Sequence, residues 1–341
     1  MNIILILTCF AAFYNIKITS YNKDYLSAQQ TENLKGIFIL LVLFHHLNIF
    51  AGVGDIYNFF SNAGFIAVGG FLFISGYGLM YQFEYKGRAY VKSFPKRRLF
   101  VVLMPAVVMS VIYFLIKWKM YGYSLSAMKD DFFRGSSVIS NGWYVTAIIY
   151  FYMTFYISSM IALILKKSEA VIILNAATEI IYIVVCLKLN YEGHWFPAAF
   201  AFCYGILWAF FKNKIDNNLE KGIFAVLAGL IIFYYILTMG LQFGYGWDEF
   251  KCLMYLTMIV LVGMKVKLQS KIMEWLGSIS YEVYLVHGLF FILLRNNYIY
   301  IADEFAFMLT LFILSFISAV ILQIMLKRNA SSATAELLFH F

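Results

Sequence analysis

The sequence predicts an all-α protein, a polytopic bundle of about 10–11 transmembrane helices. Hydrophobic residues make up 63% of the chain and aromatic residues 20%, whereas charged residues make up only 13%. These proportions lie far from those of a soluble domain. Apolar segments also recur along the chain at lengths near the roughly 20 helical residues that cross a hydrocarbon core of about 30 Å.

Eleven apolar segments are predicted to form the bundle. In chain order they lie near 2–16, 35–53, 59–83, 98–116, 142–165, 169–187, 194–211, 222–243, 249–264, 275–294 and 303–326. The first is the shortest, yet it has neither the charged start nor the clear cleavage site of a signal peptide, so an uncleaved helix is expected. The longest connection, about 117–141, is polar and aromatic. Each of the three prolines lies near a segment end, so no proline kink is expected in mid-membrane.

Basic residues predict the orientation of these segments, because Lys and Arg collect in short loops on the cytoplasmic side. The connection KGRAYVKSFPKRR, residues 86–98, holds six of them, and alternate connections along the chain are basic as well. With that connection inside, 19 of the 26 basic residues lie in cytoplasmic loops. We therefore expect a multi-pass protein of the cytoplasmic membrane, with its N-terminus outside and its C-terminus in the cytoplasm.

Charge and cysteine content narrow the expected partners. The net charge of +8 is spread over loops that flank the membrane, which indicates contact with membrane lipid and no nucleic-acid partner. The four cysteines occur singly in or beside apolar segments, without CxxC spacing. They are interpreted as packing residues, so neither a metal site nor a disulfide framework is predicted.

Ionisable groups inside apolar segments carry the functional information, because each is costly in hydrocarbon. In LKGIFILLVLFHHLN, residues 34–48, Lys35 and His46 are eleven residues apart, so an α-helix places them on one face about 16 Å apart along its axis. A cation at the membrane rim with a titratable base deeper in suits a ligand that has an anionic head and a reactive end. Packing between helices is the alternative for His46, and it is favoured for His45, which points about 100° away.

Five stretches carry a family resemblance, and they occur in a fixed order. They are KGIFILLVLFHH with Lys35 and His46, FLFISGYGL with Ser75, KRRLFVVLMP at 96–105, GWYVTAIIYFY with Trp143, and LGSISYEVYLVH from Leu276 to His287. In these stretches the sequence resembles the acyltransferase-3 family of membrane proteins, over about residues 31–326. It departs from the family at Lys35, where arginine is usual, and at Val101, where a basic residue is common.

The resemblance implies both an architecture and an activity. The transmembrane domain is expected over 31–328, after an N-terminal membrane helix and cytoplasmic connector at 1–30 and before a short cytoplasmic tail at 329–341. The implied activity is that of an acyl-CoA-dependent O-acyltransferase. It takes an acyl group, commonly acetyl, from cytoplasmic acyl-CoA and passes it to a hydroxyl of a cell-surface or exported polysaccharide. Acyl-CoA is then a substrate, and no tightly bound cofactor is expected.

Catalytic roles follow from that resemblance. His46 is expected to be the general base, because a neutral imidazole in hydrogen-bond reach activates a weakly nucleophilic hydroxyl. His287 lies at a similar depth on a stripe with Ser280 and Tyr284, and His287 or Tyr284 is expected to orient substrate or stabilise developing charge. A polar packing stripe is the alternative.

Binding roles are assigned on the same basis. Lys35, Arg97 and Arg98 are expected to bind the anionic CoA head, although simple anchoring at the inner surface also explains the two arginines. Ser75 either bonds the thioester carbonyl or bonds back to its own helix, and no base can be assigned to make it a nucleophile. Trp143 either stacks on sugar rings or belongs to the aromatic belt at the outer surface.

A transporter or exporter of a glycan or lipid-linked saccharide is the main rival, with His46 and His287 as polar lining. Such a protein more often has two related halves with broken helices in matching positions, and the sequence has no such symmetry. A structural membrane subunit is disfavoured by the number of buried ionisable groups.

Overall fold

The computed structural model describes residues 2–50, 55–61, 63–219, 222, 224–238 and 245–329. The predicted tail at 329–341 therefore lies outside the described residues except for its first position.

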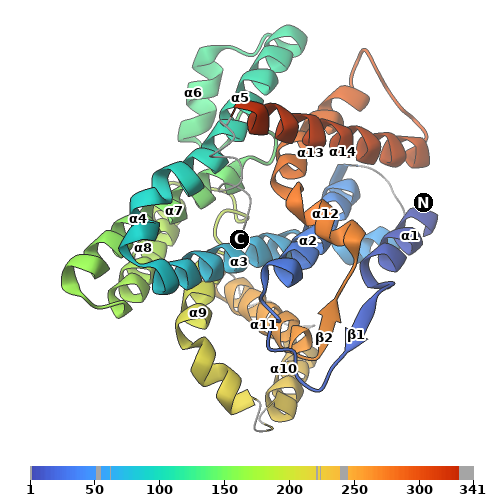
Figure 1. The fold of residues 1–341 in the computed structure, drawn as a ribbon. Helices are drawn as coiled ribbons and strands as arrows, with labels where there is room; N and C mark the ends of the chain where they lie inside the picture. Colours follow the sequence, from blue (N-terminus) through green and yellow to red (C-terminus); the bar gives the residue numbers. More distant parts are fainter. Residues whose placement is uncertain are drawn as a thin grey trace.

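Helices dominate the architecture, and two short strands join distant parts of the chain (Figure 1). In chain order the elements are α1 (Asn2–Phe13), β1 (Ile16–Ile18), α2 (Ala28–Phe50), the 3-10 helix η1 (Asp55–Phe60), α3 (Ala63–Lys86), α4 (Arg88–Phe94), the π-helix η2 (Pro95–Leu99), α5 (Phe100–Tyr121), α6 (Leu125–Phe133), α7 (Trp143–Leu165), α8 (Glu169–Lys188), α9 (Phe200–Asn218), α10 (Phe224–Thr238), α11 (Tyr245–Gly263), β2 (Val266–Leu268), α12 (Lys271–Ser278), α13 (Ser280–Leu294) and α14 (Glu304–Asn329).

The predicted all-α membrane bundle is confirmed, because each predicted apolar segment is mainly helical where the structure describes it. Within the described residues five continuous helical stretches are long and apolar enough to cross a membrane, and a bent helix pair would add a sixth. The other predicted segments are shorter or more polar. The 12 residues of α1, for example, rise only about 18 Å against a core of about 30 Å.

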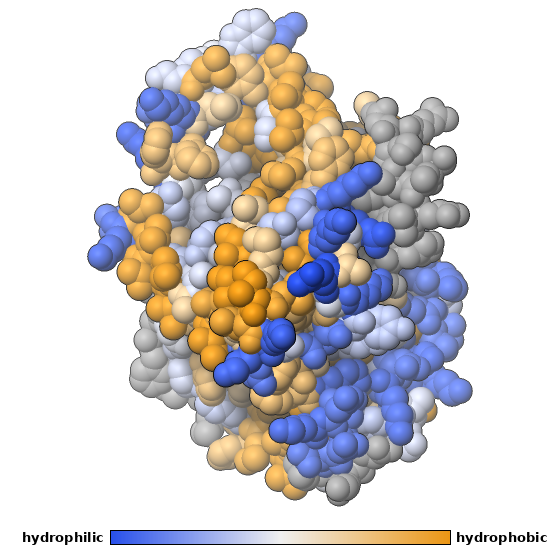
Figure 2. Space-filling model, turned by 60° about the vertical axis from the view of Figure 1, so that its left-hand side comes forward, coloured by the Kyte–Doolittle hydropathy of each residue, from blue (hydrophilic) through white to orange (hydrophobic). Residues whose placement is uncertain are grey.

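The outer surface of the bundle fits a hydrocarbon solvent. On α14, Ile313, Ile317 and Ile321 follow one face at helical spacing, and each is about half exposed. Figure 2 shows apolar side chains over the centre and top of one side of the molecule, with hydrophilic side chains gathered at the lower right. Apolar exposure on this scale is unusual for a soluble monomer, so the chain is a polytopic membrane protein.

Glycines allow a close contact between α3 and α9. A Cβ on Gly76 would collide with the carbonyl oxygen of Phe202, and a Cβ on Gly205 would collide with that of Phe73. Small residues at a crossing let helix backbones approach closely, which is a main source of helix association in membranes. This contact fixes the position of α3, the helix that carries Ser75.

Replacing Gly205 with alanine should therefore weaken the fold. Gly205→Ala forces the backbones of α3 and α9 apart, at an expected overpacking cost of about 1–3 kcal/mol. The matched control is Gly229→Ala, because a Cβ on Gly229 in α10 meets open space and alanine favours a helix over glycine by about 0.5–1 kcal/mol. Thermal unfolding in detergent should show a lower Tm for Gly205→Ala only. Equal melting of the two variants would contradict close packing at this crossing.

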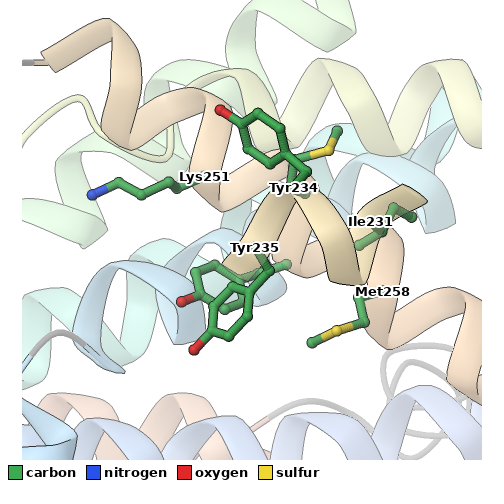
Figure 3. Close-up of a pocket in the computed structure, with 7 residues that line it drawn as sticks. Ile231, Tyr234, Tyr235, Lys251 and Met258 are labelled. Atoms are coloured by element: carbon green, nitrogen blue, oxygen red, sulfur yellow. The ribbon is translucent and has the colours of Figure 1, made fainter. Parts of the chain in front are cut away.

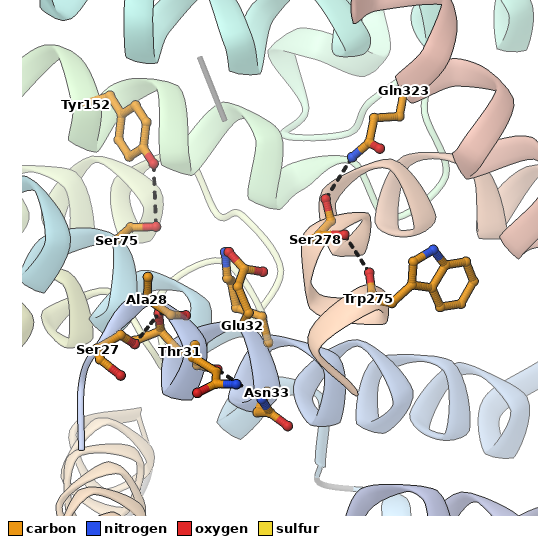
Figure 4. A network of polar contacts seen from close by, with 12 residues as sticks. Ser27, Ala28, Thr31, Glu32, Asn33, Ser75, Tyr152, Trp275, Ser278 and Gln323 are labelled. Carbon is orange, nitrogen blue, oxygen red and sulfur yellow. Dashed lines mark hydrogen bonds and ion pairs between the residues drawn. The ribbon is translucent and has the colours of Figure 1, made fainter. Parts of the chain in front are cut away.

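The prediction of one continuous span at 275–294 is wrong, because α12 and α13 meet at a bend of 74°. The break lies at Ile279, whose ψ of 9° departs from the helix. Contacts from other helices hold it there: the carbonyl of Ser278 accepts a hydrogen bond from Gln323 Nε2 at 2.8 Å (Figure 4), and Gly277 lies against the backbone of Glu32 in α2. The bend thus follows from tertiary packing, and it sets the start of α13, the helix that carries His287.

The two strands were not predicted. β1 pairs with β2 in antiparallel register, with Ile16 opposite Leu268 and Ile18 opposite Val266. The side chain of Gln30 completes the edge, since its Nε2 donates to the carbonyl of Leu268 at 2.7 Å and its Oε1 accepts from the Leu268 amide at 2.9 Å. The pair ties the segment before α2 to the segment before α12.

Candidate functional site

Two histidines from distant parts of the chain meet inside the bundle. His46 lies near the end of α2 and His287 in the middle of α13, and their Nδ1 and Nε2 atoms are 2.8 Å apart. The two ring planes differ by 10°, and the ring centroids lie 4.9 Å apart. His287 is fully buried and His46 partly buried. The two residues, which helical spacing places at similar depths, are thus in direct contact.

His287 is anchored on its other side by its own helix. Its Nδ1 lies 2.7 Å from the carbonyl oxygen of Tyr284 and 3.2 Å from that of Val283. Phe291 packs edge-on against both imidazoles, with ring centroids 6.5 Å from His46 and 6.3 Å from His287. These contacts fix the histidine pair in aromatic and largely apolar surroundings.

His45 occupies a different environment, as expected of a packing residue. Its Nδ1 lies 3.1 Å from the carbonyl oxygen of Phe60, and its ring fills the space beside Gly64. The ring centroid lies 5.3 Å from that of His46. His45 therefore joins α2 to η1 and α3.

Tyr284 connects the histidine pair to the segment before α7. Its ring lies 5.7 Å from that of His287 and 5.2 Å from that of Tyr144, and its hydroxyl donates to the carbonyl oxygen of Asn141. Asn141 has a φ of 60°, in the left-handed region that asparagine tolerates better than most residues. This turn brings the carbonyl to Tyr284 and starts α7 at Trp143.

Trp143 lies in a small aromatic cluster at the start of α7. Its ring centroid lies 5.4 Å from that of His194 and 6.1 Å from that of Trp195, both in the segment before α9. Partial burial lowers the pKa of His194, although the carboxylate of Glu192 at 3.3 Å opposes that shift. His194 was not predicted as a site residue: it stands at the edge of the predicted segment 194–211, whereas the helix there begins only at Phe200.

A cleft of about 490 Å³ lies where the start of α2 meets the ends of α3 and α9. This volume falls in the range of small-molecule sites. Three lysines line the cleft, Lys23, Lys35 and Lys212, together with Asp24. The rings of Tyr77 and Tyr81, which also line it, stack at 6.0 Å with planes 19° apart. Of these residues the sequence had identified only Lys35.

Carboxylates hold two of the lysines in place. Lys35 Nζ lies 2.5 Å from Glu32 Oε1, one turn earlier on α2, and Lys212 Nζ lies 2.5 Å from Asp216 Oδ2 on α9. Asp216 also accepts hydrogen bonds from the hydroxyls of Tyr21 and Tyr25, at 3.0 and 2.8 Å. Figure 4 shows the start of α2 near this cleft, with the Ser27 and Thr31 contacts of its first turn. An anion in the cleft would therefore compete with built-in carboxylates for these ammonium groups.

The other predicted binding residues lie elsewhere. Ser75 is on α3 beside the cleft residue Ile74, and its Oγ lies 3.5 Å from the Tyr152 hydroxyl (Figure 4). Arg97 and Arg98 lie in η2 and are not among the residues that line the cleft. Arg98 Nε donates to the hydroxyl of Tyr90 at 3.2 Å.

A second hollow lies between α10 and α11, where Tyr234, Tyr235 and Lys251 surround it (Figure 3). Its volume of about 10 Å³ is close to the minimum that holds a single water molecule. It is too small to be a substrate site. Among the described residues, no group of three or more His, Cys, Asp or Glu side chains is arranged to hold a metal ion.

Comparison with known proteins identifies a family. The acyltransferase-3 family model, described as an acyltransferase domain, matches residues 30–324. No curated protein and no solved structure matches the chain. The matched region includes the histidine pair, Tyr284, Trp143 and the cleft residues Lys35 and Lys212.

Proposed function

The chain belongs to the acyltransferase-3 family of membrane acyltransferases, and we propose that it is an acyl-CoA-dependent O-acyltransferase of the cytoplasmic membrane. Its acceptor is a hydroxyl of a cell-surface or exported polysaccharide, and its donor is acetyl-CoA or another short acyl-CoA. The N-terminus lies outside and the C-terminus in the cytoplasm, as the distribution of lysine and arginine predicts.

The arrangement of α2 supports this proposal most directly. One helix carries Lys35, which lines a cleft of about 490 Å³, and His46, which lies eleven residues further along and contacts His287. The rise of an α-helix separates the two positions by about 16 Å. A cationic cleft at one end and a pair of imidazoles deeper in the bundle suit a donor with a charged head and a thioester at the end of a long arm.

Lys23, Lys35 and Lys212 are the residues we assign to the phosphates of the donor. Ammonium groups bind phosphate as point charges, so Lys35 serves this role without the geometry of the family arginine. Because Arg97 and Arg98 do not line the cleft, their role as direct donor ligands is less well supported than that of Lys212. Glu32 and Asp216 hold Lys35 and Lys212 in position until the donor arrives.

His46 is assigned as the general base of the transfer. It takes the proton from the acceptor hydroxyl as the oxygen attacks the thioester carbonyl, and a C–O ester bond replaces the C–S bond. The thiolate of CoA leaves and takes up the proton, so no net charge is created. Trp143 and His194 are assigned to the acceptor, since aromatic rings beside the outer end of α7 offer a surface for sugar rings.

Direct transfer predicts that Ser75 is dispensable. The hydroxyl of Ser75 contacts Tyr152, whereas the histidine pair lies on α2 and α13. Ser75→Ala should retain the rate of acyl transfer within about threefold, because it removes one long neutral hydrogen bond, at 3.5 Å, whose loss costs about 0.5 kcal/mol. Mass spectrometry of the wild-type protein with acetyl-CoA should find no acetylated serine. A trapped acetyl-Ser75 would contradict direct transfer.

The activity itself is tested with purified protein in detergent. Acetyl-CoA and a mixed oligosaccharide pool are supplied, and both thiol release and ester formation on the oligosaccharides are measured. Release of CoA with a matching amount of ester is expected. Absence of both, together with absence of acetyl-CoA binding, would reject the proposal and favour a glycan transporter.

A further inference from the structure

The contact between His46 and His287 has the geometry of a hydrogen bond in the plane of both rings. Their nitrogens lie 2.8 Å apart, which is shorter than the about 3.5–4.0 Å at which stacked ring atoms touch. The ring planes differ by only 10°. Rings that are nearly parallel and that close together must meet edge to edge. The lone pair and the N–H bond of an imidazole both lie in the ring plane, so the contact is a directed N–H···N bond.

The backbone of α13 determines which nitrogen carries each proton. Nδ1 of His287 faces the carbonyl oxygens of Tyr284 at 2.7 Å and Val283 at 3.2 Å. Carbonyl oxygens only accept, so this Nδ1 carries a hydrogen and donates it. In a neutral imidazole the other nitrogen then carries the lone pair, so Nε2 of His287 is an acceptor. Among the described residues, the ring nitrogen that contacts this Nε2 is Nδ1 of His46, which therefore carries the hydrogen and donates it.

We infer that His287 is a positioning residue, which holds His46 in the Nδ1–H tautomer and thereby places the basic lone pair of His46 on Nε2. The chain of bonds runs from the Tyr284 carbonyl through His287 to His46. The positioning role of His287 in catalysis rests on the proposed function. The tautomer of His46 does not depend on it. The arrangement resembles other catalytic bases whose second ring nitrogen is fixed by a hydrogen-bonding partner.

A neutral pair is the state that fits the surroundings. In the part of the chain that the structure describes, the two rings contact Tyr284, Phe291 and His45, none of which is a carboxylate. An imidazolium buried beside them would need a compensating carboxylate, because an unpaired charge in an apolar site is costly. His287 therefore stays neutral and orients His46, while His46 gains a proton only during the transfer.

Nitrogen NMR measures the tautomer directly. Protonated and unprotonated ring nitrogens resonate in well-separated ranges, so full-length protein with ¹⁵N-labelled histidine in detergent reports each ring. His46→Gln and His287→Gln assign the two sets of signals. The expected result is a protonated Nδ1 and an unprotonated Nε2 on both rings. Protonation of His46 at Nε2, or of both nitrogens of His287, would overturn the inference.

Kinetics then separate positioning from structural support. His287→Leu removes the acceptor and should lower kcat about 100-fold, with KM for acetyl-CoA unchanged. His287→Gln offers its Oε1 as an acceptor to the same N–H of His46. Its kcat should therefore be at least about tenfold higher than that of His287→Leu. Equal rates for the two variants, at matched Tm, would overturn the positioning role. A wild-type protein without acyl transfer but with the expected tautomers would reject the proposed function and leave the tautomer assignment standing.

Discussion

His46→Ala should lower the rate of acyl transfer by about 100-fold or more while the protein remains folded. The general base contributes about 10²–10⁴ to such reactions, and alanine leaves the acceptor hydroxyl with no group in that position to take its proton. Binding of acetyl-CoA should be retained, because the lysine cleft lies about 16 Å away along α2. Thiol release and ester formation give the rate, and equilibrium binding of acetyl-CoA gives the affinity.

His45→Ala is the matched control. It removes a neighbouring imidazole from the same helix, but one that bonds the Phe60 carbonyl and packs beside Gly64. We expect a lower Tm and a rate within about threefold of the wild type, as for a loss of packing and one hydrogen bond. If His46→Ala kept its full rate, or if the two alanine variants lost activity equally at matched Tm, His46 would not be the base.

Lys35→Glu should raise the KM for acyl-CoA at least about tenfold, with a smaller effect on kcat. The change replaces a cation in the cleft by an anion and places it beside Glu32, so two carboxylates then face the donor phosphates. The phosphates lie far from the reacting carbonyl, so the ground state and the transition state should lose the same contact. Such a loss raises KM and leaves kcat nearly unchanged. Initial rates over a range of acetyl-CoA concentrations give both constants.

Lys214→Glu controls for the overall charge of this end of the bundle. Lys214 lies on α9 two residues from Lys212, is exposed, and is not among the residues that line the cleft. The same change of charge there should leave the KM for acetyl-CoA within about threefold, because exposed charges are screened over about 10 Å at 0.1 M salt. An equal rise in KM for Lys35→Glu and Lys214→Glu would mean that the cleft does not bind the donor.

The helices were predictable from the sequence because the length of an apolar segment is enough to predict that it forms a helix. Each segment must satisfy its backbone hydrogen bonds internally in lipid, so a long apolar run becomes a helix whatever surrounds it. The break at Ile279 was not predictable, since nothing in LGSISYEVYLVH forbids a straight helix. It depends on Gln323 and on the close approach of Gly277 to α2, contacts that only the folded bundle creates.

The sequence was enough to predict how deep in the membrane the two histidines lie, but not which residues contact each other in the candidate site. Counting residues along α2 and α13 places His46 and His287 at similar heights, but helical spacing does not say which helices are neighbours. The direct contact of the rings, the link from Tyr284 to Asn141 and the cleft of three lysines all join segments far apart in sequence. Lys23 and Lys212 lie in the basic connections that the sequence places in the cytoplasm, and a charge pattern alone cannot separate membrane anchoring from ligand binding.

Acyl transfer from one side of the membrane to the other is expected, and proteoliposomes test it directly. The protein is reconstituted so that its Lys35 end faces the lumen, acetyl-CoA labelled in the acetyl group is trapped inside, and the oligosaccharide pool is added outside. Labelled ester is expected on the external oligosaccharides with wild-type protein and not with His46→Ala. External oligosaccharide that enters the vesicles without becoming acylated would contradict the account, because it would show a transporter instead of an acyltransferase.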